Sequence, residues 1–209
     1  MKKGLFVTFE GLDLTGKSTL IKLLKERNED WIFTREPGGT DCKLAEDIRN
    51  FILNYPDIID STTEAYLFAA SRAAHTQQIE KWLNEGKIVI CDRYLASSMY
   101  YQGVMKGLES KIVKDINCIA VGELYPHKSF FVTVSEIERN KRMSLRKEIN
   151  QLDKQSADVR YIEANIDYYN ITNELALYGT HLIDTTDGDT LRHVKEIEKI
   201  IDNMVMENI

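Results

Sequence analysis

The chain is poor in cysteine and proline and has no long apolar run. Only three cysteines occur in 209 residues, at positions 42, 91 and 118, and their spacing fits neither a disulfide framework nor a metal site. The three prolines, at positions 37, 56 and 126, fall between the elements expected below. No stretch approaches the roughly 18 apolar residues that a membrane span needs. We therefore expect a soluble protein of a reducing compartment, the cytoplasm, with no membrane partner.

The chain also lacks an excess of positive charge. Its formal net charge is −6 and no basic stretch dominates, so we do not expect it to bind nucleic acid. An anionic ligand must then be held by local cations. The four histidines are dispersed, without a serine, cysteine or acid at the spacing of a catalytic triad. A length of 209 residues predicts a single domain, 1–209.

Residues 11–18 read G-L-D-L-T-G-K-S and match the phosphate-binding P-loop pattern, between a run of strand type and a run of helix type. The loop's N–H groups and the following helix N-terminus favour a bound phosphate. We expect an exposed lysine reaching the β- and γ-phosphates and a serine hydroxyl on Mg²⁺. The residues expected to hold ATP are Gly11, Leu12, Asp13, Leu14, Thr15, Gly16, Lys17, Ser18 and Thr19.

Short apolar runs alternate with helical stretches along the whole chain. The runs read as buried strands and the stretches as covering helices. With the P-loop, this alternation predicts an α/β protein of the P-loop NTPase fold: a five-stranded parallel sheet with helices on both faces. The expected strands are 5–9, 31–34, 88–91, 130–134 and 181–183, and the expected helices are 17–28, 43–53, 62–85, 96–105, 110–121, 155–177 and 190–207.

Charged residues follow these strands, at the carboxyl edge where parallel sheets bind ligands. Asp92 and Arg93 come directly after the third strand. Asp92 could hold Mg²⁺ opposite Ser18, directly or through water, and Arg93 could bind a phosphate through two parallel hydrogen bonds. The alternative interpretation is a surface aspartate–arginine pair. The P-loop on the neighbouring strand favours the functional interpretation over this alternative.

Several segments together are more specific than the P-loop. From about residue 4 to about residue 185, in order and at the usual spacing, the chain resembles bacterial thymidylate kinases. The resemblance implies the strand order 2-3-1-4-5. It also implies transfer of the γ-phosphoryl group of ATP to dTMP, giving dTDP, with Mg²⁺ and in a homodimer. The segments that carry it are F-E-G-L-D (9–13), T-R-E-P-G-G-T (34–40), L-F-A-A-S-R (67–72), D-R-Y-L-A-S-S (92–98) and Y-Q-G (101–103).

The resemblance also implies roles for residues of the acceptor site. Asp13 would hydrogen-bond the 3′-hydroxyl of the substrate, and Arg35 with Glu36 would line the pocket of the acceptor phosphate. Phe68 would stack on thymine and Arg72 would contact the edge of the base. Phe68 and Arg72 are four residues apart and share one helix face. The alternative for these two is a core phenylalanine and an arginine that extends to solvent.

Three further positions follow from the Asp92–Gly103 region. Ser98 stands where some relatives have an asparagine on the base, so its contact would be weaker or water-mediated. Tyr101 would occupy the space of a ribose 2′-hydroxyl and select deoxy substrates, although one of the tyrosines at 100 and 101 must belong to the core. Gln102 would lie near the base or the acceptor phosphate.

The P-loop leaves one basic side chain for phosphoryl transfer. Relatives take a second cation either from the P-loop or from a lid after the fourth strand. In this chain Leu14 stands at the P-loop position where the first type of relative has a basic residue. We therefore expect a lid at about 138–153 to supply it, because the moving phosphoryl group needs positive charge.

The lid offers several cations. Arg142 and Arg146, four residues apart, are expected to be catalytic together with Lys17 and Arg93, while Arg139 and Lys147 remain candidates. A solvated basic helix is the alternative reading of this stretch.

Other nucleotide-binding functions stay open at this stage. A deoxynucleoside kinase or another deoxynucleoside monophosphate kinase would share the sheet, the P-loop and the lid. A phosphate acceptor explains Arg35 and Arg93 better than a neutral nucleoside does. A switch NTPase would need no second nucleotide pocket and would leave Phe68, Arg72 and Tyr101 without a role.

Overall fold

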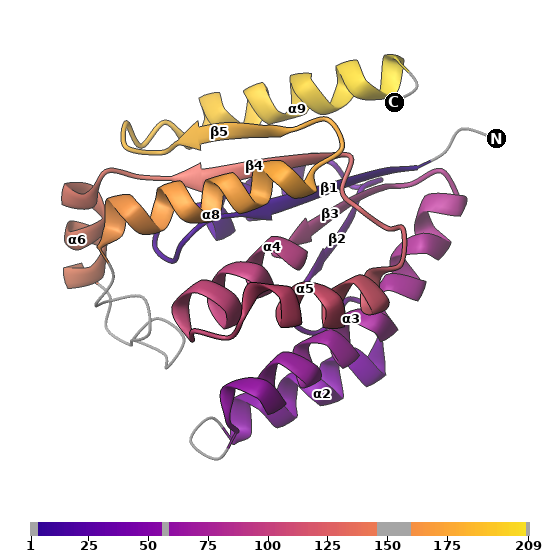
Figure 1. Ribbon diagram of the computed structural model, residues 1–209. Helices are drawn as coiled ribbons and strands as arrows, with labels where there is room; N and C mark the ends of the chain where they lie inside the picture. Colours follow the sequence, from indigo (N-terminus) through magenta and orange to yellow (C-terminus); the bar gives the residue numbers. More distant parts are fainter. Residues whose placement is uncertain (1–3, 56–58, 146–159, 208–209) are drawn as a thin grey trace.

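Five parallel strands form the centre of the computed structural model, which describes residues 4–55, 59–145 and 160–207 (Figure 1). The strand order is β2-β3-β1-β4-β5 and every neighbouring pair is parallel. This confirms the predicted fold. The strands are β1 Leu5–Glu10, β2 Ile32–Arg35, β3 Ile88–Asp92, β4 Lys128–Thr133 and β5 Thr180–Asp184.

The helices follow the predicted alternation with three differences. The helix expected over 155–177 spans Tyr161–Leu175, and residues 155–159 lie outside the described residues. The stretch expected as one helix over 96–105 is a four-residue helix that continues as a π-helix, and the first part of the predicted lid is itself helical. The helices are α1 Lys17–Arg27, α2 Lys43–Asn54, α3 Ser61–Asn84, α4 Leu95–Ser98, the π-helix η1 Met99–Met105, α5 Ser110–Val121, α6 Glu136–Leu145, α8 Tyr161–Leu175 and α9 Thr190–Met206.

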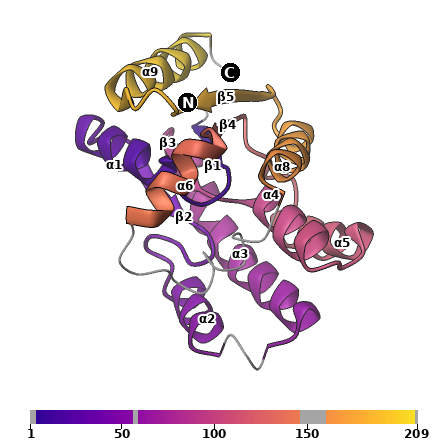
Figure 2. The ribbon, with the colours of Figure 1, turned by 90° about the vertical axis from the view of Figure 1, so that its left-hand side faces the viewer.

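Helices cover both faces of the sheet because the strands are apolar on both faces. Along β1, Val7 and Phe9 pack with α1 and α9, whereas Phe6 packs with α3 and α5 on the opposite side. Figure 2 shows α1 and α9 on one side of the sheet and α5 and α8 on the other. Within the described ranges, no helix is long and apolar enough to cross a membrane.

All five strands end at one edge because they run in the same direction. The P-loop follows β1 there, the R-E-P-G-G segment begins at the last residue of β2, and the D-R-Y segment begins at the last residue of β3. Helix α6 follows β4 and lies in front of this edge in Figure 2. The topology thus gathers the predicted site residues in one place.

Candidate active site

The P-loop backbone needs both of its pattern glycines. At Gly11, with a φ of 137°, a Cβ atom would stand 2.2 Å from the carbonyl oxygen of Val132 on the neighbouring strand. Gly16 has a φ of 90° and precedes α1, and its carbonyl accepts from the N–H groups of Thr19 and Leu20. Both conformations favour glycine. The loop can therefore pass close to the sheet and then enter the helix.

Lys17 is buried, not exposed as expected from its place after the loop. Its side chain is only 7% exposed and its ammonium group pairs with the carboxylate of Asp92. The pairing arises because α1 begins at the end of β1, and β3, which ends at Asp92, is the adjacent strand. Burial favours a higher pKa for Asp92, but the charges of Lys17 and Arg93 outweigh it and lower the pKa.

A cavity of about 550 Å³ surrounds the P-loop. Both residues predicted to hold a metal, Ser18 and Asp92, line it, as does Arg142 from α6. The remaining lining residues are Leu12, Asp13, Leu14, Thr15, Gly16, Lys17, Thr19, Leu20, Arg93, Thr185, Gly188 and Thr190. The P-loop residues predicted to hold ATP therefore face this cavity, apart from Gly11, which approaches the sheet.

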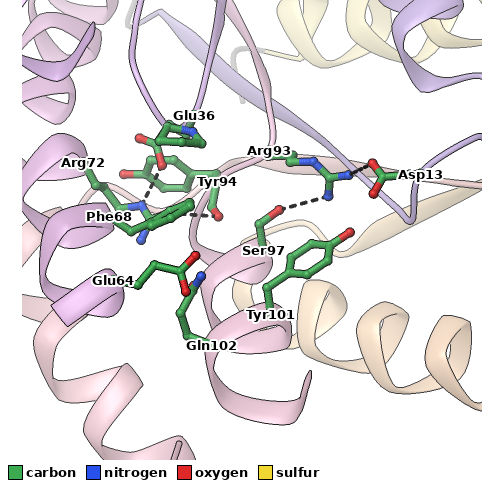
Figure 3. A pocket seen from close by; sticks show the side chains of 11 residues that line it. Asp13, Glu36, Glu64, Phe68, Arg72, Arg93, Tyr94, Ser97, Tyr101 and Gln102 are labelled. Atoms are coloured by element: carbon green, nitrogen blue, oxygen red, sulfur yellow. Dashed lines mark hydrogen bonds and ion pairs between the residues drawn. The ribbon is translucent and has the colours of Figure 1, made fainter. Parts of the chain in front are cut away.

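A second, smaller cavity of about 80 Å³ lies beside the first (Figure 3). Seven of the nine predicted substrate residues line it; the other two, Arg35 and Ser98, do not. Its lining residues are Asp13, Glu36, Pro37, Glu64, Phe68, Arg72, Arg93, Tyr94, Ser97, Tyr101 and Gln102. The structure thus places residues from four separate chain segments around one small pocket.

Asp13 and Arg93 line both cavities and join them. The Nη2 atom of Arg93 donates to a carboxylate oxygen of Asp13 at 2.7 Å. The guanidinium of Arg93 also lies over the ring of Tyr101, 5.1 Å from its centre. Arg93 has a left-handed backbone, with a φ of 67°, which is unusual for a residue with a side chain. A charged pair therefore stands where the two cavities meet.

Arg72 is held in a buried network at the wall of the smaller cavity. It is 2% exposed, donates to Glu36 at 2.6 Å and to Ser98 at 3.0 Å, and also contacts Asn117. His75 approaches the other carboxylate oxygen of Glu36 at 3.0 Å. Ser98 therefore lies behind Arg72, where its hydroxyl supports the arginine and does not line the cavity.

Arg35 and Arg49 lie near each other beside the R-E-P-G-G segment. Arg35 is exposed, pairs with Glu46 at 3.1 Å and lines neither cavity. Arg49, which no sequence motif indicated, donates to the carbonyl of Pro37 at 2.9 Å. Burial lowers the pKa of Arg49, and so does the charge of Arg35. The packing of α2 thus adds a second cation to this side of the site.

Among the described residues of the predicted lid, Arg142 is the cation that lines the larger cavity. Its guanidinium donates to the carbonyl oxygens of Leu14 and Thr185, at 3.2 and 3.1 Å, and to Glu138 at 3.2 Å. Arg139 is 4% exposed and lies over the ring of Tyr161, 4.8 Å from its centre. The rest of the predicted lid, including Arg146 and Lys147, lies outside the described residues.

The sequence patterns missed several residues of the two cavities. Glu64, Pro37 and Ser97 line the smaller one, and Thr185 and Gly188 line the larger. Glu64 and Thr185 belong to no motif, and only packing brings them to the site. Pro37 and Ser97 lie within the segments 34–40 and 92–98, which carry the resemblance. Their proximity to predicted site residues was the only sequence signal that could have indicated them.

Comparison with known proteins shows the family to which the chain belongs. The sequence profile of the family described as Thymidylate kinase matches residues 9–187. The chain belongs to the thymidylate kinase family. A thymidylate kinase of Mycoplasma mobile is 38% identical over 209 residues, which cover 94% of this chain and 99% of that protein. A thymidylate kinase of Finegoldia magna is 46% identical over 157 residues, covering 72% of this chain and 76% of the relative.

A solved structure of the family agrees as well. The crystal structure of thymidylate kinase from Ehrlichia chaffeensis superposes with a TM-score of 0.71 at 29% sequence identity, covering 96% of this chain and 99% of that chain. The resemblance seen in the sequence is thereby confirmed at the level of family and fold.

Proposed function

We propose that the larger cavity holds ATP and that the residues around the smaller one bind dTMP, so that Asp13 and Arg93 stand between donor and acceptor. The chain is a kinase that transfers the γ-phosphoryl group of ATP to dTMP, as its family membership indicates. The observation that carries the assignment of sites is that the two cavities share this charged pair. A two-substrate transfer requires such adjacency, because the reacting groups must meet in line.

A panel of acceptors tests the acceptor class. ADP release should be measured with dTMP, thymidine, the other deoxynucleoside monophosphates and no acceptor. We expect turnover with dTMP to exceed that with every other compound in the panel. Faster turnover with thymidine would favour a deoxynucleoside kinase. Faster turnover with another monophosphate would mean that the acceptor site recognises a different base. Equal ADP release without acceptor would favour a switch NTPase.

The chain's own groups act by positioning and by charge. We propose that the P-loop N–H groups and Lys17 hold the phosphates of ATP, for which Lys17 must exchange its contact with Asp92 for a phosphate. Arg93 binds phosphate at the junction, where it faces both ligands. Because phosphoryl transfer spreads negative charge over three oxygens, these cations stabilise the transition state more than the bound substrates.

Ser18 and Asp92 are proposed to hold Mg²⁺. Both line the larger cavity, and both offer oxygen atoms, which are the ligands that Mg²⁺ prefers. Mg²⁺ usually keeps several waters and binds substrate phosphates, so water and phosphate oxygens would complete the coordination. The bound ion would neutralise charge on the phosphates of ATP.

The walls of the smaller cavity are proposed to recognise deoxythymidine. Phe68 would stack on thymine, Arg72 would read the base edge with Gln102 beside it, and Asp13 would accept from the 3′-hydroxyl. Figure 3 shows Phe68 and Arg72 on one side of the pocket and Asp13 and Tyr101 on the other. The acceptor phosphate would lie toward Glu36 and Arg93, and Arg35 would have to release Glu46 to reach it. Ser98 would act through Arg72.

Tyr101 is expected to exclude a 2′-hydroxyl group by its bulk. Replacing Tyr101 with alanine should narrow the ratio of kcat/KM between dTMP and its 2′-hydroxy analogue, because room for one oxygen appears. Tyr101→Phe keeps the ring and should keep the ratio, so it is the matched control. A ratio unchanged in the alanine variant would place the selectivity elsewhere.

We also propose that the lid supplies a cation to the transferred group. Arg146→Met should lower kcat far more than it raises KM for dTMP, since the contact forms mainly in the transition state. Arg142→Met should lower kcat less and should also raise KM for ATP, because Arg142 holds the P-loop carbonyl of Leu14. If single and double substitutions at Arg142, Arg146 and Lys147 leave kcat within about twofold, the lid is not the donor.

A homodimer in the cytoplasm completes the proposal. Exposed apolar side chains lie on three adjacent helices, for example Phe51 on α2, Tyr66 on α3 and Ile119 on α5, and Ile119 is 88% exposed. Burial of such side chains against a second copy would be favourable. Sedimentation velocity should show a species of twice the chain mass, whereas a monomer at micromolar concentration would contradict the proposal.

A further inference from the structure

A buried carboxylate lies directly beneath Arg93 and lines neither cavity. Glu10 ends β1 and is 1% exposed. One of its oxygens accepts from the backbone N–H of Tyr94 at 2.8 Å. The other lies 2.8 Å from the hydroxyl of Ser97 and 2.5 Å from the hydroxyl of Tyr168, a residue of α8 that is fully buried. Three elements thus converge on one acidic side chain.

The same two hydroxyl groups connect Glu10 to Arg93. The Nη1 atom of Arg93 lies 3.2 Å from the hydroxyl of Tyr168 and 3.5 Å from that of Ser97. The Ser97 and Tyr168 oxygens are themselves 2.5 Å apart. Glu10 and Arg93 are therefore linked by hydrogen bonds through these two hydroxyl groups, while the Nη2 atom of Arg93 donates to Asp13.

The direction of these hydrogen bonds follows from the chemistry of the end groups. A guanidinium can only donate, so both hydroxyl oxygens must accept from Arg93. An ionised carboxylate can only accept, so at least one hydroxyl proton points toward Glu10, and the other can serve either Glu10 or the contact between Ser97 and Tyr168. Glu10 consequently fixes Ser97 and Tyr168 as acceptors for the arginine. Burial raises the pKa of Glu10, and the hydrogen bond from Tyr168 and the charge of Arg93 partly offset that rise.

We propose that Glu10, acting through the hydroxyl groups of Tyr168 and Ser97, is a positioning residue that holds the guanidinium of Arg93 between the two cavities. The proposal rests on the role of Arg93 under the proposed function. Arg93 needs such support because its left-handed backbone fixes where the side chain starts, but only contacts along the side chain fix where the guanidinium ends. Without the hydroxyl acceptors, the guanidinium would keep Asp13 as its main partner and would lose its orientation.

A tyrosine pair in the same aromatic stack provides the test. The rings of Tyr100 and Tyr168 are parallel, with centres 4.5 Å apart, and both residues are buried. The Tyr100 hydroxyl, however, contacts Met105 and not Arg93. Tyr168→Phe should lower kcat about tenfold, as expected for loss of a hydrogen bond to a charged group. Tyr100→Phe removes an equivalent hydroxyl and should leave kcat within about twofold, at a similar thermal midpoint.

A double-mutant cycle separates positioning from a structural effect. In an Arg93→Met background, Tyr168→Phe should cause no further loss of kcat, because its target is gone. Glu10→Gln should also lower kcat in the wild type and cause no further loss in the Arg93→Met background. If Glu10→Gln does not fold, the cycle of Tyr168→Phe with Arg93→Met still tests the proposal. An equal loss from Tyr168→Phe with and without Arg93 would overturn the proposal, as would equal effects at Tyr100 and Tyr168. If instead Arg93→Met alone keeps the wild-type kcat, the proposed role of Arg93 itself fails.

Discussion

Replacing Lys17 with alanine should lower kcat about 10²–10³-fold, since one charge contact made in the transition state is lost. The measurement is steady-state kcat with ATP and dTMP at saturation. Lys22 lies on the same helix but is 79% exposed and pairs only loosely with Glu26, so Lys22→Ala is the matched control and should keep wild-type activity. Retention of more than about a tenth of wild-type kcat in Lys17→Ala would contradict the assignment of the P-loop.

The burial of Lys17 adds a second expectation. Because its ammonium group pairs with Asp92, Lys17→Ala leaves a poorly solvated carboxylate without its cation and should also lower the thermal midpoint. Adding Asp92→Asn removes that charge and should restore part of the stability without restoring kcat. Recovery of activity in the double variant would show that Lys17 acts only by neutralising Asp92.

Replacing Arg93 with methionine should have an effect of similar size, about 10²–10³-fold on kcat, because Arg93 is proposed to face both ligands. Arg93→Lys keeps the charge but not the two-pronged geometry, so it should recover only a small part of the loss. Arg27, which pairs with Glu198 on the surface, offers a control: Arg27→Met should leave kcat unchanged.

Kinetic constants decide what Arg93 does. A large rise in KM for dTMP with unchanged kcat would make Arg93 a binding group of the acceptor site alone. A rise confined to KM for ATP would make Arg93 a binding group of the ATP site alone. We expect kcat to fall most, because the arginine stands at the junction of the cavities.

Much of the fold was predictable because its signals are local. Buried parallel strands appear as short apolar runs, and the P-loop glycines fix a backbone that few other sequences adopt. The position of Asp92 opposite the P-loop also followed, because parallel strands end at one edge. Arg35 shows the limit of such reasoning: it stands at the carboxyl end of β2, as the last residue of the strand, yet its side chain pairs with Glu46 and lines neither cavity.

The remainder of the site depends on contacts between distant segments. The π-helix η1 winds more widely than an α-helix, so a 3.6-residue period could not indicate which of its side chains face the pocket. Lys17 was expected in solvent because its burial depends on a partner 75 residues away. Glu10 and Tyr168 are 158 residues apart, and only the packing of α8 on the sheet brings them together.

Direct transfer of label tests whether the chain phosphorylates dTMP. The purified chain is incubated with Mg²⁺, ATP labelled in its γ-phosphoryl group and dTMP, and the labelled products are separated. We predict that the label passes to dTDP, with one ADP formed for each dTDP. Label released as inorganic phosphate in the presence of dTMP, or transferred to thymidine but not to dTMP, would contradict this function.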